Sequence, residues 1–115
     1  MEITITTKDR ILVVAINGDI DHHTATLIKE RSEKEYTLNG SRDMILDFSD
    51  VSFMDSSGIG MIIGRYKNVE SNGGRLVVFG ASKNVSRIFT MSGLGKIIKV
   101  CSTLQEAIDF LKKEV

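Results

Sequence analysis

Apolar and polar residues follow two different periods along this chain, and each change of period separates a predicted strand from a predicted helix. At the start, Ile3 and Ile5 alternate with threonines, which predicts a short strand. An unbroken apolar run over residues 11–16 predicts a second, more deeply buried strand. Asp9 and Arg10 form a predicted turn between the two runs, so we expect an antiparallel hairpin.

Downstream of the hairpin, helical patterns alternate with short apolar runs. The runs at residues 44–48, 76–79 and 97–100 predict three more strands. A helix is predicted over residues 22–38, although its apolar face is weak and places Ser32 where a core residue is expected. The other three helices have clearer apolar faces, formed by Ile59, Ile62, Ile63, Tyr66 and Val69 in the first, by Val85, Ile88 and Phe89 in the second, and by Leu104, Ala107, Ile108 and Leu111 in the third.

Residues typical of helix ends support these boundaries. Asp21 and Ser82 are N-cap candidates for the first and third helices. Thr103 and Glu106 have the spacing of a capping box at the start of the fourth helix. The glycine-containing segment at residues 72–74 is expected to end the second helix.

This order of elements predicts one α/β domain that covers residues 1–115. Strands joined through helices form right-handed parallel crossovers. We therefore expect a mixed sheet of about five strands, antiparallel only at the N-terminal hairpin, packed with about four helices. The functional groups of such sheets usually lie beyond the carboxyl ends of the strands. Ser56 and Ser57 follow the predicted strand at 44–48, so we expect them at that edge.

Composition narrows the class of protein. Apolar residues make up 42% of the chain, which is enough for a packed core. Fifteen basic and fifteen acidic residues balance, which argues against a dedicated nucleic-acid binder and leaves no polybasic patch for a membrane surface. The longest apolar run is too short to span a bilayer, and the N-terminus has no signal-peptide pattern. With Cys101 as the single cysteine, we expect a reducing, cytoplasmic setting.

The segment Asp55-Ser56-Ser57-Gly58 joins the strand at 44–48 to the next helix and is the main candidate for chemistry. Free backbone N–H groups and the helix dipole favour negative charge at such a place. A serine there is either an ordinary helix cap or a position where a phosphate is held. Both interpretations are open from the residues alone, and capping is the commoner role of a serine at a helix start.

Three kinds of enzyme site fit the residues poorly. A triad of Asp21, His22 and Ser56 is conceivable, but residue 54 is Met, so the Gly-x-Ser-x-Gly elbow of a serine hydrolase is absent. Two adjacent histidines, His22 and His23, point in different directions on a helix and do not form a metal-binding pair. The segment at 92–97 resembles a P-loop only in part, because Ile and a strand follow its Gly-Lys.

Two other possibilities concern regulation and docking. A phospho-receiver domain is disfavoured because Asp47 lies inside its predicted strand and no acidic pair follows the first buried strand. Phosphorylation of a serine by another protein remains, and it adds about −1.5 to −2 charges near neutral pH. Gly60 and Gly64 lie four residues apart on one helix, so they form a flat strip for close packing on the sheet or for a partner's backbone.

Several segments of the chain, in family order, resemble the STAS domains, in particular the bacterial anti-sigma factor antagonists. Within that family the sequence is most similar to the sporulation antagonist, which acts on the anti-sigma factor of the forespore sigma factor. The segments that carry the resemblance are residues 18–25 (GDIDHHTA), 52–60 (SFMDSSGIG), 64–67 (GRYK), 91–94 (MSGL) and 96–98 (KII).

The resemblance implies a regulatory protein with no catalytic activity or cofactor of its own. Its unphosphorylated form would bind an anti-sigma factor that is also a serine kinase using ATP and magnesium, and would thereby release the sigma factor. Ser56 falls on the family's phosphoacceptor, and a dedicated serine phosphatase would reset it. The partner-binding residues would be Asp21, His22, Thr24, Asp55, Ser57, Gly58 and Gly60. A general stress-response antagonist with the same switch is the alternative, and a small serine hydrolase ranks far below it.

Overall fold

The predicted N-terminal hairpin is present and forms one edge of the sheet. In the computed structural model, which describes residues 1–113, β1 (Glu2–Lys8) pairs antiparallel with β2 (Ile11–Asn17). The turn residues Asp9 and Arg10 have φ angles of 53° and 64°, the left-handed region that a two-residue hairpin turn requires. The Arg10 carbonyl accepts a hydrogen bond from the Arg42 N–H at 2.8 Å, so the turn is tied to the start of the central strand.

The remaining elements alternate between helix and strand. In chain order they are α1 (His22–Leu38), β3 (Asp43–Asp50), α2 (Ser56–Ser71), β4 (Leu76–Phe79), α3 (Lys83–Ser92), a 3₁₀ helix (Leu94–Lys96), β5 (Lys99–Cys101) and α4 (Leu104–Lys112). The five strands lie in the order β1-β2-β3-β4-β5, and all neighbours after the hairpin are parallel. The predicted α/β class, mixed five-stranded sheet and four helices are confirmed.

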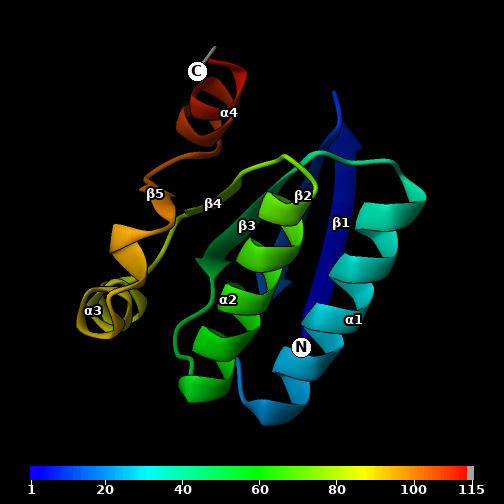
Figure 1. Cartoon of the computed structure of the whole chain (residues 1–115). Helices are drawn as coiled ribbons and strands as arrows, with labels where there is room; N and C mark the ends of the chain where they lie inside the picture. Colours follow the sequence, from blue (N-terminus) through cyan, green and yellow to red (C-terminus); the bar gives the residue numbers. More distant parts are fainter. Residues whose placement is uncertain (114–115) are drawn as a thin grey trace.

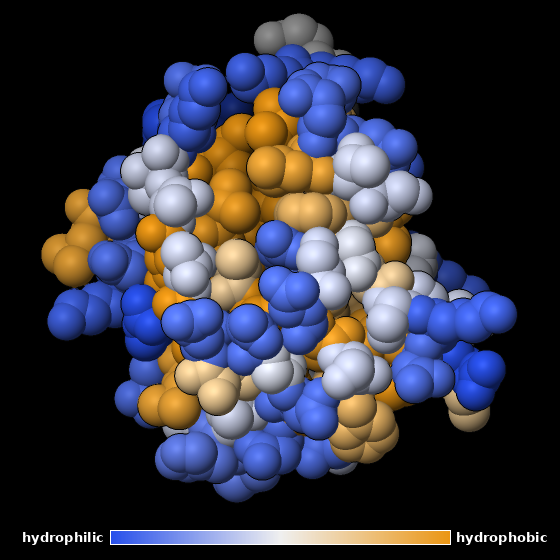
Figure 2. All heavy atoms as spheres, turned by 180° about the vertical axis from the view of Figure 1, so that it is seen from behind, coloured by the Kyte–Doolittle hydropathy of each residue, from blue (hydrophilic) through white to orange (hydrophobic). Residues whose placement is uncertain are grey.

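Helices cover the two faces of the sheet unequally. The larger core joins α1, α2 and α3 to one face, where Leu12, Met44 and Val78 are buried. On the other face, α4 packs against β3, β4 and β5, and the smaller core there includes Ile45 and Leu111. In Figure 1, α1 and α2 lie side by side in front of the strands. Figure 2 shows the opposite face, where apolar surface is visible among polar side chains.

One predicted boundary and two predicted faces need correction. The last strand is Lys99–Cys101 rather than 97–100, because a 3₁₀ helix occupies residues 94–96. Leu104 was expected on the apolar face of α4 but is 40% exposed. The buried face of α2 is also rotated from the predicted one, since it consists of Gly58, Met61, Ile62, Arg65 and Val69, with Ile59, Ile63 and Tyr66 only partly buried.

The weak apolar face of α1 does pack as predicted. Ala25, Ile28, Ser32 and Tyr36 are its four buried residues. Ser32 is fully buried, and its hydroxyl donates to the Lys29 carbonyl of the preceding turn at 3.2 Å. Because this hydrogen bond satisfies the hydroxyl inside its own helix, a serine fits a core position without a partner from another element. Across residues 1–113, no helix is both long enough and apolar enough to cross a membrane.

Candidate functional site

Two loops at the carboxyl end of the sheet are joined by a short parallel bridge between Ile20 and Met54. The Ile20 N–H donates to the Phe53 carbonyl, and the Asp55 N–H donates to the Ile20 carbonyl, both at 3.0 Å. Ile20 precedes α1 by one loop residue, Asp21, and Met54 precedes α2 by one loop residue, Asp55. The bridge therefore fixes the N-termini of the two helices beside each other at the predicted functional edge.

Asp21 caps α1 through a reciprocal pair of hydrogen bonds. Its Oδ1 accepts from the Thr24 N–H at 2.9 Å, and the Thr24 Oγ1 accepts from the Asp21 N–H at 2.8 Å. The hydrogen bond from the Thr24 backbone, followed by that from the Thr24 hydroxyl, lowers the pKa of Asp21 below 3.8. Asp21 is exposed, so a charged, well-oriented carboxylate faces solvent at this end of the molecule.

Asp55, and not a serine, is the N-cap of α2. Its Oδ1 accepts from the Ser57 N–H at 2.8 Å, and its carbonyl accepts from the Gly58 N–H at 3.0 Å. Ser56 is the first helical residue and is exposed, and its hydroxyl makes no hydrogen bond within residues 1–113. Because the cap position is already filled by a carboxylate, the helix start does not require the Ser56 hydroxyl. The hydroxyl therefore has no structural role at the cap.

The three glycines of α2 have different surroundings. A Cβ at Gly58 would lie 3.0 Å from the Met54 Cβ and Sδ and 3.3 Å from the Ile20 Cγ2. Gly58 therefore lets the start of α2 pack directly on the Ile20–Met54 bridge. At Gly60 and Gly64, a Cβ would meet no atom within 4 Å, so neither is required for close packing within the domain. Of the two interpretations of that pair, packing on the sheet is wrong.

A groove of about 230 Å³ runs between the first turns of α1 and α2. Its lining residues are His22, Ala25, Thr26 and Lys29 from α1, and Ser57, Gly60 and Met61 from α2. Thr26 and Lys29 are new to the site and follow His22 at four and seven residues, the spacing of one helical face. That periodicity in the sequence was the signal that could have identified them. The groove brings the predicted residues His22, Ser57 and Gly60 together beside the exposed Ser56.

An ion pair farther along the same helices joins the buried Arg65 to a half-exposed glutamate, Glu33. Arg65 of α2 is only 2% exposed, and its Nη2 lies 2.9 Å from Oε2 of Glu33 in α1. The Nε and Nη1 atoms of Arg65 are buried without a hydrogen-bond partner within residues 1–113. A buried cation with a single partner depends strongly on that partner. Glu33 thus fixes the spacing of α1 and α2 below the groove.

The structure also bears on the alternatives from the sequence. His22 and His23 lie exposed in the first turn of α1, and no hydrogen bond within residues 1–113 joins His22 to Ser56. The P-loop-like segment is a helix end, since α3 stops at Gly93 with φ 80° and a 3₁₀ helix follows. Among the residues that the structure describes, no group of three or more His, Cys, Asp or Glu side chains could hold a metal ion.

One class of small regulatory domain combines these three features: this sheet order, paired helix starts and an Asp-Ser-Ser-Gly segment. The chain matches the STAS domain family over residues 2–107 and belongs to it. Two curated relatives are 34% identical. The "Anti-sigma F factor antagonist" of Paenibacillus polymyxa matches over 90 residues, 78% of this chain and 77% of the relative. The "Anti-sigma-B factor antagonist" of Listeria monocytogenes matches over 103 residues, 87% of this chain and 90% of the relative.

Solved structures agree with this family assignment. The anti-sigma factor antagonist SpoIIAA in its unphosphorylated form superimposes with a TM-score of 0.84 at 30% identity, covering 99% of both chains. The Bacillus cell fate determinant SpoIIAA in its phosphorylated form superimposes with a TM-score of 0.75 at 28% identity, covering 96% of this chain and 100% of that one. These likenesses extend over nearly the whole domain.

Proposed function

We propose that this STAS domain is an anti-sigma factor antagonist controlled by phosphorylation of Ser56. In its unphosphorylated form it binds an anti-sigma factor that is also a serine kinase carrying ATP or ADP with magnesium, and so releases a sigma factor. The kinase then phosphorylates Ser56 and the complex separates. A serine phosphatase restores the binding form in the cytoplasm. The domain itself catalyses no reaction and contacts neither nucleic acid nor membrane.

One observation carries the proposal: Ser56 is exposed at a helix start whose cap is Asp55. Its hydroxyl has no structural hydrogen bond to lose within residues 1–113, so a kinase can reach it without unfolding the helix. Ser57 is half-buried, its N–H is held by Asp55, and it lines the α1–α2 groove. These differences support Ser56 as the reactive serine and Ser57 as the supporting one.

The docking surface would include Asp21, His22, Thr24, Asp55, Ser57 and Gly60. Asp21 and His22 are exposed at the start of α1, and Gly60 is exposed on the groove side of α2. Gly58 contributes indirectly. Because it has no side chain, the start of α2 packs closely on the Ile20–Met54 bridge, which holds the two helix starts beside each other. A partner that covers both starts would place its active site over Ser56.

Phosphorylation would weaken this complex through local charge and volume. The phosphoryl group adds about −1.5 to −2 charges beside the Asp55 carboxylate, in a region that also contains Asp21. The helix N-terminus stabilises the group on the free domain. In the complex, however, the same group would lie against the phosphates of the nucleotide held by the kinase, where like charges repel. The switch thus acts on binding and leaves the fold intact.

The name of the Listeria relative supports a second candidate pathway, the general stress response. An antagonist in a general stress response would use the same surface and the same serine. The anti-sigma F relative, the SpoIIAA structures and the GDIDHHTA segment support the sporulation pathway. Measuring the affinity of the chain for a sporulation and a stress-response anti-sigma factor from its own genome separates the two. Tighter binding to the stress-response factor would assign the chain to the stress-response pathway instead.

The acceptor is tested by incubating the chain with its anti-sigma kinase, ATP and magnesium. We expect one added group of about 80 Da in the intact mass, mapped to Ser56 by peptide sequencing. Ser56→Ala should abolish the addition, whereas the matched variant Ser57→Ala should keep it. Normal phosphate uptake by Ser56→Ala would disprove the acceptor assignment. Uptake lost in both variants, with both folded, would show instead that Ser57 takes part in kinase docking.

A further inference from the structure

The outer edge of β1 is an open strand edge whose sequence complements itself. Strand β1 pairs with β2 on one side only, and at the end of the sheet order its other side has no neighbouring strand among residues 1–113. An edge strand leaves a row of backbone N–H and C=O groups ready to pair with another strand. Its seven residues, EITITTK, contain no proline, and the described ladder with β2 is continuous without a bulge.

The hairpin register determines which backbone groups face outward. Lys8 and Ile11 close a two-residue turn, so they form a hydrogen-bonded pair, and the pairs at Thr6 and Thr4 repeat it. The intervening residues Ile3, Ile5 and Thr7 then direct their N–H and C=O groups away from β2. An independent contact agrees with this, because the Arg31 guanidinium donates to the Ile3 carbonyl from outside the sheet at 3.0 Å.

A second copy of β1, placed antiparallel and centred on Ile5, would satisfy all of these outward groups. Ile5 would face Ile5 of the other copy, and Ile3 would face Thr7, each as a hydrogen-bonded pair. The residues between them would form the closer, non-hydrogen-bonded pairs, with Thr4 facing Thr6 and Glu2 facing Lys8. Opposite charges in such cross-strand pairs stabilise a sheet. In this register Glu2 of each copy faces Lys8 of the other, so the two-fold axis produces two such pairs, one at each end of the paired strands.

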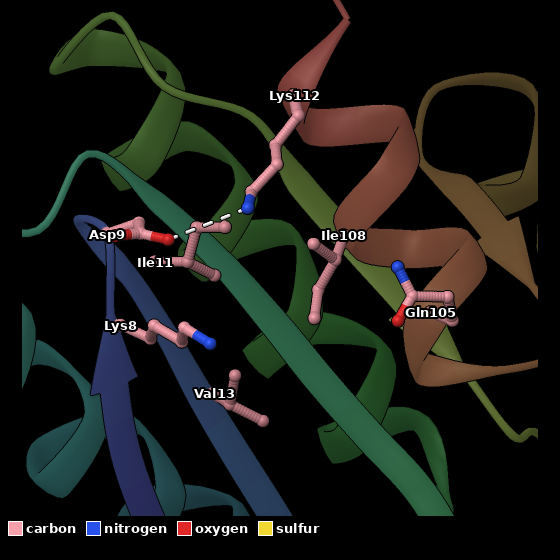
Figure 3. A pocket seen from close by; sticks show the side chains of 7 residues that line it. All are labelled: Lys8, Asp9, Ile11, Val13, Gln105, Ile108 and Lys112. Atoms are coloured by element: carbon pink, nitrogen blue, oxygen red, sulfur yellow. Dashed lines mark ion pairs between the residues drawn. The ribbon is translucent and has the colours of Figure 1, made fainter.

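Both charged residues are available for this pairing. Within residues 1–113 the ion pairs are Arg65–Glu33 and Lys112–Asp9, so neither Glu2 nor Lys8 is engaged. Figure 3 shows Lys112 reaching Asp9 across a pocket on the back of the sheet, which Lys8 also lines without forming an ion pair there. Lys8 is exposed, as are Glu2, Thr4 and Thr6. The back of β1 thus presents a polar row whose end charges have opposite sign.

We infer that two copies of this chain associate through their β1 strands into a symmetric dimer with a continuous ten-stranded sheet, five strands from each copy. The interface is isologous, since each residue meets its counterpart through one two-fold axis at Ile5. Arg31 releases the Ile3 carbonyl when Thr7 of the second copy replaces it. Because the strands run antiparallel across the axis, the two helix-start edges with Ser56 lie at opposite ends of the dimer. Each could engage a partner independently.

The test uses charge reversal at the two ends of β1 and sedimentation equilibrium over a concentration series. Glu2→Lys alone brings two lysines together at each end of the paired strands, and Lys8→Glu alone brings two glutamates together. Each variant should weaken the dimer about tenfold, which corresponds to about 1.4 kcal/mol. A mixture of the two single variants pairs every charge with its opposite, so a heterodimer as tight as the wild-type dimer should form. Lys83→Glu on α3, far from β1 in the sheet order, is the matched control and should leave dimerisation unchanged.

Three results would overturn the inference. The wild-type chain could remain monomeric throughout the series. Glu2→Lys could dimerise as tightly as wild type, which would place any dimer on another surface. The mixture of single variants could fail to restore association although each variant gives a native circular dichroism spectrum. None of these results bears on phosphorylation of Ser56, so this inference and the proposed function fail separately.

Discussion

Adding one methyl group at Gly58 or at Gly60 of α2 should have opposite effects on stability. Gly58 is buried against the bridge that joins the two helix starts, whereas Gly60 lies exposed beside the groove. In Gly58→Ala the new Cβ would lie 3.0 Å from two atoms of Met54 and 3.3 Å from Ile20, closer than ordinary van der Waals contact. In Gly60→Ala it would meet no atom within 4 Å.

The expected magnitudes follow from two competing terms. Replacing glycine by alanine within a helix gains about 1 kcal/mol from backbone propensity. Overpacking a tightly packed position costs about 1–3 kcal/mol, and the contact involves Met54 Cβ as well as its flexible Sδ. We therefore expect Gly60→Ala to be about 1 kcal/mol more stable than wild type. Gly58→Ala should be about 1 kcal/mol less stable, because overpacking exceeds the propensity gain.

Urea denaturation measures this difference directly. With an m-value of about 2 kcal/mol/M, the midpoints of the two variants should differ by about 1 M urea, with unchanged slopes. Gly64→Ala is a second control, since its Cβ also meets no atom within 4 Å. If Gly58→Ala is as stable as Gly60→Ala, the tight packing of α2 on the bridge is wrong. Gly60→Ala should nevertheless weaken partner binding, because the methyl group narrows the groove.

Three other predictions concern stability and titration. Glu33→Ala should lower the free energy of unfolding measured in urea by about 2 kcal/mol, since it leaves the buried Arg65 cation unpaired. Adding Arg65→Met should recover part of that loss, and an unchanged midpoint in Glu33→Ala would refute the stabilising role of the Arg65–Glu33 ion pair. The Asp21 carboxylate should titrate below pH 3.8 by carbon NMR, because the Thr24 hydrogen bonds favour its charged form. Its contribution to stability is therefore present above pH 3.8 and is lost as the pH falls through the lowered pKa. A titration above pH 3.8 would contradict the capping geometry. Arg10→Gly should raise the free energy of unfolding by about 0.5 kcal/mol by relieving the left-handed backbone at φ 64°, and a loss of stability would show that the Arg10 side chain matters more than its backbone.

The order of elements followed from periodicity because most strands and helices here obey one period each. Residues 11–16 and 76–79 are continuous apolar runs and form strands buried on the sheet. The last strand was displaced because Ile97 and Ile98 are both apolar, yet only Ile98 is buried. A local pattern cannot distinguish a buried loop residue from a strand residue when a short 3₁₀ helix precedes it.

The buried face of α2 shows a different limit of sequence reasoning. Ile59 and Ile63 suggested one face, but Arg65 occupies the buried side and is neutralised by Glu33, 32 residues earlier. Such long-range pairing is not visible in local periodicity. The same holds for the bridge between Ile20 and Met54, which sets the relative height of the two helix starts. The sequence indicated the edge of the sheet on which Ser56 lies, whereas only the structure identified Asp55 as the N-cap of α2.

A phosphate on Ser56 is proposed to weaken binding to an anti-sigma kinase strongly without disturbing the fold. The most direct measurement is calorimetric titration of that kinase, loaded with ADP and magnesium, with the unmodified chain and with the chain phosphorylated at Ser56. We predict measurable binding for the unmodified chain and at least about tenfold weaker binding for the phosphorylated one, with equal unfolding midpoints. Equal affinities of the two forms would contradict the switch.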